Sequence, residues 1–147
     1  MRIETPTSVL RDWTEDDIPA LVQNADNPRI ASGLRDGFPS PYTEEDARRF
    51  ITTATTTPGA LLLAIDVAGE AIGGIGVHPL ADVYRKTAEI GYWVAQPYWG
   101  RGIATDAVRA LVPVAFRTSD IVRLQAGVFS GNPASMPSSI RSLWTCA

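Results

Sequence analysis

The chain changes from a strand pattern to a helix pattern within residues 88–111, which read AEIGYWVAQPYWGRGIATDAVRAL. From Ala88 to Val94 alternate residues are apolar, as expected of a strand that buries one face. Gly100 and Gly102 then form a turn, and apolar residues recur after it with helical spacing. Glycines let successive backbone N–H groups converge on an anion, and the first helical turn adds unpaired N–H groups and a partial positive charge. The segment predicts a pyrophosphate cradle, although the glycines alone are equally consistent with a turn that only leads into a helix.

Two common nucleotide-binding motifs are absent from this segment. It has no Gly-x-x-x-x-Gly-Lys-[Ser/Thr] sequence, and no lysine follows Gly102 where it would reach a terminal phosphate. It also has no Gly-x-Gly-x-x-Gly sequence, and it follows several strands instead of opening a parallel βαβ unit. These observations count against an ATP-dependent enzyme and against a dinucleotide-dependent oxidoreductase.

The composition indicates one globular domain. With 147 residues, 45% of them hydrophobic, the chain is long enough for one buried core. The formal net charge of -3 gives no overall attraction to nucleic acid or to an anionic membrane, and no segment reads as a membrane span. The single cysteine, Cys146, has no intrachain partner, so we expect a reducing, cytoplasmic location.

Two helices are predicted upstream of the quoted segment from their caps. Thr14 and the three acidic residues after it predict a helix over Glu15–Ala25. Thr43 begins a capping box in which Asp46 takes the place of the usual glutamate, and an amphipathic run follows. We expect this second helix to end at the threonine run Thr52–Thr57, because β-branched residues favour strand or turn.

Strands are predicted on both sides of these helices. Ile3–Leu10 has extended character, and Leu61–Val67 and Ala71–Val77 read as an antiparallel hairpin around a short turn. Val122–Phe129 reads as a further strand after the helix that follows the glycine turn. That helix contains Pro113, which removes one hydrogen bond and is expected to kink it.

With these elements in this order, the chain resembles the GNAT N-acetyltransferases, in the branch similar to the ribosomal-protein N-acetyltransferases RimJ and RimL. The resemblance covers about Val9–Ser135 and rests on residues 88–111 together with LRDWTEDD, NPRIASGLRDGFPSPYTEEDARRFI and AIGGIGVHPL. It implies a mixed α/β (α+β) fold, with a central, mostly antiparallel sheet flanked by helices, in one domain over residues 1–147. It also implies acetyl-CoA as the donor and direct attack by a primary amine, either a protein N-terminus or a small molecule.

The resemblance further implies which residues hold acetyl-CoA. The family writes the pyrophosphate loop as Gln/Arg-x-x-Gly-x-Gly/Ala, and Trp99 stands here at the Gln/Arg position, a departure from the general pattern that suits this branch. The residues expected to bind the pyrophosphate are Trp99, Gly100, Arg101, Gly102, Ile103, Ala104 and Thr105. The pantetheine arm is expected to pair with the strand end at Tyr92, Trp93 and Val94, which splays from its neighbour, and to contact Asn132.

Acetyl transfer needs a neutral amine, and so a base or a water chain that takes its proton. Glu89 is the predicted base, a choice that the resemblance supports, and the alternative is a structural carboxylate paired with Arg85 or Lys86. The resemblance implies that Ser135 is the acid, or an orienting group, for the departing thiolate, and the alternative is a solvated serine in an Asn-Pro turn. His78, the only histidine, is interpreted as a surface-turn residue, and the alternative is a catalytic base. No metal site is expected, because the chain has one histidine and one cysteine and no clustered ligands.

The family pattern is lost after Met136. Pro137 and the serines after it disfavour the helix that family members continue with, and residues 137–147 are too few for two closing strands. We therefore expect the C-terminal helix and closing strands to be missing, as in a truncated or frame-altered product. The exposed sheet edge would then favour a homodimer. The alternative function is a catalytically impaired, acyl-CoA-binding or self-associating remnant of such an enzyme.

Overall fold

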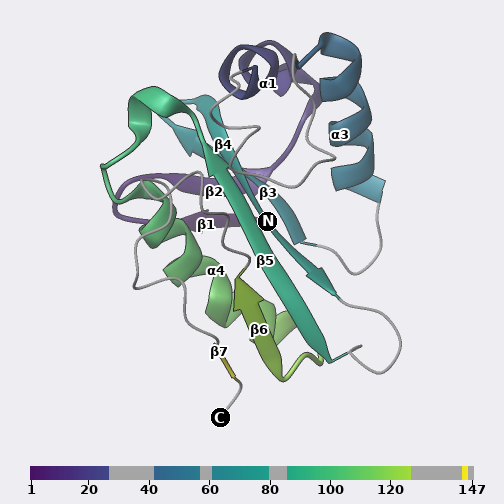
Figure 1. Cartoon of the computed structure of the whole chain (residues 1–147), viewed down its shortest axis with the longest axis vertical. Coiled ribbons are helices and arrows are strands. Elements are labelled where there is room, and N and C mark those ends of the chain that lie inside the picture. Colours follow the sequence, from purple (N-terminus) through teal and green to yellow (C-terminus); the bar gives the residue numbers. More distant parts are fainter. Residues whose placement is uncertain (27–41, 57–60, 80–85, 127–143, 146–147) are drawn as a thin grey trace.

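In the computed structural model, residues 1–26, 42–56, 61–79, 86–126 and 144–145 are described, and they form one seven-stranded sheet with helices on both faces (Figure 1). The strands lie in sequence order, and all neighbours are antiparallel except β5 and β6, which are parallel. They are β1 (Arg2–Glu4), β2 (Val9–Asp12), β3 (Leu61–Val67), β4 (Glu70–Pro79), β5 (Thr87–Val94), β6 (Arg123–Ala126) and β7 (Trp144–Thr145). The helices are η1 (Glu15–Asp17), α1 (Ile18–Ala25), α3 (Glu44–Thr56), η3 (Gln96–Tyr98) and α4 (Ile103–Thr118), of which η1 and η3 are 3-10 helices.

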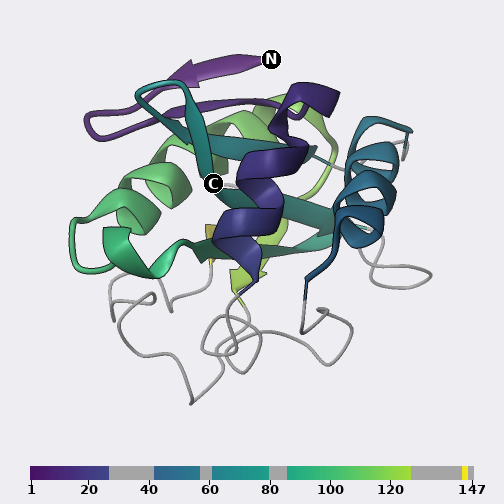
Figure 2. The same ribbon diagram turned by 90° about the horizontal axis from the view of Figure 1, so that it is seen from above.

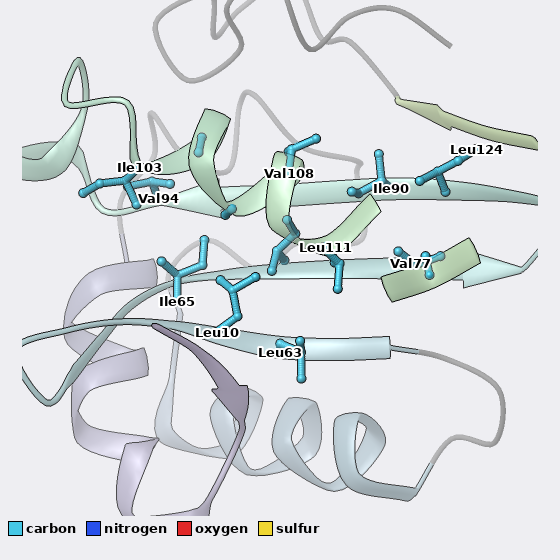
Figure 3. Close-up of a cluster of buried hydrophobic side chains, with 14 of the residues drawn as sticks. Leu10, Leu63, Ile65, Val77, Ile90, Val94, Ile103, Val108, Leu111 and Leu124 are labelled. Carbon is cyan, nitrogen blue, oxygen red and sulfur yellow. The ribbon is translucent and has the colours of Figure 1, made fainter. Parts of the chain in front are cut away.

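Two hydrophobic clusters lie on opposite faces of the sheet, because side chains alternate along each strand. In β5, Ile90 and Val94 belong to the cluster that contains the buried residues of α4, whereas Trp93 belongs to the cluster that contains those of α1 and α3. Figure 3 shows Val108 and Leu111 of α4 among the strand side chains of the first cluster. Figure 2 shows α1 and α3 beside each other and apart from α4. Strand β5 therefore presents one face to each side of the domain.

The first strand prediction was wrong in one respect. Ile3–Leu10 is not one extended segment but parts of two paired strands, β1 and β2, joined by a turn. The Thr5 hydroxyl accepts the N–H groups of Thr7 (3.2 Å) and Ser8 (2.9 Å), which reverses the chain. A short side-chain hydrogen bond has here overridden the apolar strand pattern.

Both predicted helix starts are confirmed. The Asp46 N–H donates to Thr43 Oγ1 (3.2 Å), and the Asp46 carboxylate accepts the Thr43 N–H (3.0 Å). In the same way the Asp17 carboxylate accepts the Thr14 N–H at 2.9 Å, so that the helix predicted over Glu15–Ala25 begins with the 3-10 turn η1.

The predicted end of the second helix was wrong, because α3 continues through the threonine run to Thr56. The hydroxyl groups of Thr53 and Thr56 donate to the carbonyl oxygens four residues earlier, those of Arg49 (3.0 Å) and Thr52 (2.6 Å). These bonds satisfy the hydroxyl groups inside the helix, so the β-branched residues are accommodated there.

The hairpin of β3 and β4 is confirmed, with Ala68 and Gly69 at positive φ (55° and 89°) in its turn. Strand β4 extends beyond the predicted end at Val77, to Pro79. Helix α4 runs through Pro113, whose side chain is exposed. The last predicted strand is confirmed from Arg123 to Ala126, and residues 127–129 lie outside the described residues.

The C-terminal tail adds one short strand to the sheet. Strand β7 pairs antiparallel with β6, Arg123 with Thr145 and Leu124 with Trp144. Residues 127–143, where the family pattern would place its next helix, lie outside the described residues. The homodimer across an exposed edge stays a prediction.

An ion cluster closes the N-terminal side of the sheet. The Arg11 guanidinium donates to both carboxylate oxygens of Asp17 (2.8 Å each) and, through Nε, to Asp66 (2.7 Å). Burial would raise the pKa of Asp17, which is 6% exposed, but the hydrogen bonds from Arg11 and Thr14 together lower it below its ordinary value. The hydrogen bonds to Asp17 and Asp66 raise the pKa of Arg11. The cluster ties β2 to β3 and to η1.

None of the helices in the described part of the chain is long and apolar enough to cross a membrane.

Candidate active site

The glycine turn between β5 and α4 has the backbone geometry of an anion cradle. Gly100 and Gly102 both have a φ of 77°, a left-handed conformation that glycine adopts without strain. The Gly102 carbonyl accepts the Asp106 N–H at 3.0 Å as the helix begins, so the N–H groups of Ile103, Ala104 and Thr105 precede the first intrahelical bond. These N–H donors and the positive end of the α4 dipole both lie at the N-terminus of α4, where an anion can bind.

The side chains of this turn divide into two groups. Ile103 and Ala104 are buried in the core against the sheet, so they can offer an anion only their backbone N–H groups. Arg101 is exposed, and its guanidinium carbon lies 5.3 Å from the centre of the Tyr98 ring. Arg101 is therefore the one cation among the predicted cofactor residues, held at the outer side of the turn.

Trp99 positions the turn through its indole. Its Nε1 donates to the Val94 carbonyl at 2.7 Å, and its backbone N–H donates to Gln96 at 3.1 Å. Both N–H groups of Trp99 are thus used within the protein. Its side chain is also packed against both hydrophobic clusters. The geometry supports a positioning role for Trp99, in place of direct contact between its N–H groups and a phosphate.

We expect Trp99→Phe to weaken acetyl-CoA binding about five-fold, because the hydrogen bond that holds the turn to β5 is lost while most of the packing is kept. Isothermal titration calorimetry measures the change in Kd. Tyr98→Phe is the matched control, because it keeps the ring under Arg101 and removes only a hydroxyl group. Equal affinity for Trp99→Phe and the wild type would show that the indole N–H does not order the turn.

Near the glycine turn, the backbone N–H and C=O groups of Tyr92 and Val94 in β5 point away from β4. The Ala95 N–H donates to Ile72 at the start of β4 (2.8 Å), and backbone groups two residues apart point to the same side of a strand. The backbone groups of Trp93 therefore point toward β4, and those of Tyr92 and Val94 point toward the β6 side. The pairing with β6 is described as far as Ile90 and Ala126.

This orientation refines the prediction for the pantetheine arm. Tyr92 and Val94 direct their backbone toward the edge where the arm is expected, and Trp93 does not. The Val94 carbonyl already accepts the Trp99 indole, so at Val94 only the N–H is expected to pair with an added strand.

Glu89 lies in the middle of three paired strands, half-buried, between His78 of β4 and Gln125 of β6. Alternation along β5 puts Glu89 on the face opposite α4, together with Gly91 and Trp93. His78 is exposed, as expected of a surface residue, but the predicted turn was wrong: His78 is part of β4 and directly opposite Glu89. Directly opposed residues bring their Cβ atoms within about 5.5 Å, so the sheet places an imidazole beside the predicted base.

Three of the predicted residues cannot be placed relative to this site. Asn132 and Ser135 lie outside the described residues, and so does Arg85, the alternative partner of Glu89. Lys86, the other alternative partner, is exposed and lies directly before β5. The roles of Glu89, Asn132 and Ser135 stay predictions.

Sequence reasoning missed two features of the site. The His78–Glu89 pairing follows from the register between β4 and β5, which no local sequence pattern gives. Gly91 was read only as part of a strand pattern, although an exposed glycine inside a central strand is itself a signal for close approach of another molecule.

The site lies within a segment that matches known proteins. Residues 8–137 match the family model of the acetyltransferase (GNAT) domain. The putative ribosomal N-acetyltransferase YdaF of Bacillus subtilis (strain 168) is 42% identical over 67 residues, which are 46% of this chain and 36% of YdaF. The match therefore spans little more than a third of that relative.

Solved structures confirm the fold expected from the resemblance. Mycobacterium smegmatis RimJ, solved in complex with CoA-disulfide, superposes with a TM-score of 0.75 and 22% identity, over 92% of this chain and 69% of RimJ. The ribosomal L7/L12 alpha-N-protein acetyltransferase RimL, solved in complex with coenzyme A, gives a TM-score of 0.72 and 24% identity, over 86% of this chain and 73% of RimL. At these identities the likeness concerns the fold alone.

Proposed function

Because the chain belongs to the GNAT acetyltransferase domain family, we propose that it transfers the acetyl group of acetyl-CoA to a primary amine. One observation carries this proposal: the anion cradle at the start of α4 and the half-buried carboxylate of Glu89 are connected by a single strand, β5. The cradle fits a pyrophosphate, because it offers converging backbone N–H groups, a helix N-terminus and Arg101.

The two functional groups lie on opposite faces of the sheet. The cradle belongs to α4, which packs on one face, and Glu89 points from the other. A donor bound at the cradle would extend along the β5 edge at Tyr92 and Val94, and an amine would approach beside Glu89 from the opposite face.

Acetyl-CoA supplies an activated thioester when it is bound, and the chemistry left to the protein is the handling of protons. The attacking amine nitrogen forms a bond to the acetyl carbon, the carbon–sulfur bond breaks, and CoA leaves as a thiolate. The amine proton passes to Glu89, directly or through water. Ser135 is proposed as the group that returns a proton to the thiolate.

We propose the α-amino group of a protein as the acceptor. The names of a curated relative, YdaF, and of a structural neighbour, RimL, both describe ribosomal-protein N-acetylation, which supports this choice over a small amine. A cytoplasmic location agrees with such an acceptor and is part of the same proposal.

Titration of the purified protein with acetyl-CoA by calorimetry tests the donor site without knowledge of the acceptor. We expect saturable binding of acetyl-CoA and of desulfo-CoA, and none of NAD. Binding without any turnover of amines would favour the catalytically impaired remnant. If the folded protein bound no acetyl-CoA, the proposed function would be wrong.

We expect Gly102→Val to weaken acetyl-CoA binding by at least about ten-fold, because a left-handed φ costs a side-chain-bearing residue about 1–2 kcal/mol and the cradle must shift to relieve it. The measurement is the Kd from the same titration. Gly69→Val is a matched control, because Gly69 has a φ of 89° in the hairpin turn outside the cradle. Gly69→Val should lower stability similarly and leave acetyl-CoA binding unchanged. Equal losses of affinity in both variants would mean that general destabilisation, and not the cradle, is responsible.

A further inference from the structure

Gly91 is an exposed glycine on the sheet face that carries Glu89. The paired residues on this face are Trp93 with Gly74, Gly91 with Gly76, and Glu89 with His78. Three of these six residues are glycines, and they differ in which atoms a Cβ added at each position would meet. The differences show which glycines the fold itself requires.

The two glycines of β4 are required by packing. A Cβ at Gly74 would lie 2.8 Å from Trp93 Nε1, so the indole leans across this residue. A Cβ at Gly76 would collide with Leu62 and lie 3.3 Å from His78 Nε2. Neighbouring side chains therefore occupy the space above both glycines.

Gly91 is different, because none of the residues that the structure describes lies within 4 Å of the Cβ position there and the residue is exposed. Its φ is not in the left-handed region, so a residue with a side chain would fit the backbone. A glycine inside a strand makes the strand less stable than a residue with a side chain would. Among the described residues, neither packing nor backbone geometry explains this glycine, and the space above it is open to another molecule.

The surroundings of Gly91 indicate what that molecule is. Glu89 lies two residues earlier on the same strand and face, and Trp93 lies two residues later. Leu62 and His78, which lean over Gly76, border the position from the β4 side. A carboxylate next to an uncovered stretch of backbone suits the charged amino end of a peptide, whose first peptide units can lie close against the strand.

We propose that Gly91 is the floor of the acceptor subsite, where it admits the N-terminal residue of a peptide to the space beside Glu89. This inference rests on the proposed function and adds a specificity-determining residue to it. A side chain at position 91 would occupy the space that the peptide needs and would not touch the cradle at the start of α4, which lies beyond the end of β5.

The test compares wild type, Gly91→Ala and Gly91→Val with short peptides that carry a free N-terminal glycine, serine or leucine. We expect Gly91→Ala to raise the KM for the peptides about ten-fold and Gly91→Val to raise it further, with an unchanged Kd for acetyl-CoA. Thr87→Leu is the control, because it adds bulk on the same strand and face two residues before Glu89, and it should behave as the wild type.

A second readout separates this role from a structural one. Because both substitutions replace a strand glycine in open space, the melting temperature should rise by about 2–4 °C while the peptide KM worsens. Unchanged KM values in Gly91→Val would overturn the inference, and so would a fall in stability that accounts for the loss of activity. If the wild type bound acetyl-CoA but acetylated none of the peptides, the acceptor class would be wrong and the inference with it. If it bound no acetyl-CoA, the proposed function itself would fail.

Discussion

Replacement of Glu89 by glutamine should lower kcat at pH 7 by about 10²–10³-fold and leave the Kd for acetyl-CoA unchanged. The substitution keeps the size of the side chain and removes its ability to accept the amine proton, a contribution of this order for a general base. Glu89 points from the face opposite α4, so its loss does not disturb the cradle. Release of CoA with a peptide acceptor gives kcat, and calorimetry gives the Kd.

The pH dependence of the rate shows whether the loss of kcat in Glu89→Gln comes from proton removal. An α-amino group has a pKa near 8, so above about pH 8 the acceptor is increasingly neutral without help from the protein. The difference between wild type and Glu89→Gln should therefore narrow as the pH rises from 7 to 9. Glu70→Gln, an exposed substitution at the start of β4, is the control. The same ratio of rates at every pH would remove Glu89 from the role of base.

Replacement of Arg11 by methionine should lower the free energy of unfolding at pH 7 by about 3 kcal/mol. The substitution keeps most of the side-chain length and leaves Asp17, 6% exposed, without the cation that binds both of its carboxylate oxygens. Breaking a buried ion pair from one side costs about 3–5 kcal/mol, because a buried charge stays behind. Urea denaturation followed by circular dichroism measures the change.

The same variant should alter how stability depends on acid. In the wild type the pKa of Asp17 is lowered, so its stabilising contribution is present above the unfolded-state pKa of about 4 and is lost as the pH falls through the lower folded-state value. Without Arg11, burial raises the pKa of Asp17, and the carboxylate begins to take up its proton at a higher pH than in the wild type.

Arg48→Met is the matched control for Arg11→Met. Arg48 pairs with Glu44 at 2.6 Å, but both side chains are more than 60% exposed, and such a pair contributes less than about 0.5 kcal/mol. An equally small effect for Arg11→Met would show that the cluster at Asp17 and Asp66 contributes little to stability.

Local sequence predicted the helix starts and the central hairpin because the interactions that decide them join residues close in the chain. The capping boxes at Thr14 and Thr43 each span three residues, and the turn at Ala68 and Gly69 joins adjacent strands directly. The predictions failed where a side chain had two possible partners. Thr5 reversed the chain that was expected to be extended, and the threonines of α3 stayed in the helix.

The sequence predicted which segments form the candidate site, but not how their residues contact one another. The cradle was predicted at Gly100 and Gly102, because the conformation there depends on the glycines themselves. Trp99 was assigned to the phosphate, and only the folded chain showed that its indole binds Val94. That contact depends on the conformation of the turn after β5, which the pattern of apolar residues in the sequence does not specify.

The resemblance of residues 88–111 and of three upstream segments indicated the family. The place of the donor site followed from strand alternation, a glycine turn and a helix start, which are all local properties. The pairing of His78 with Glu89, the uncovered position at Gly91 and the ion cluster around Arg11 were decided by the tertiary structure. Each of these depends on the register between strands, or on the packing of elements distant in the chain. Side-chain alternation specifies which face a residue occupies, but only the paired sheet specifies what lies opposite it.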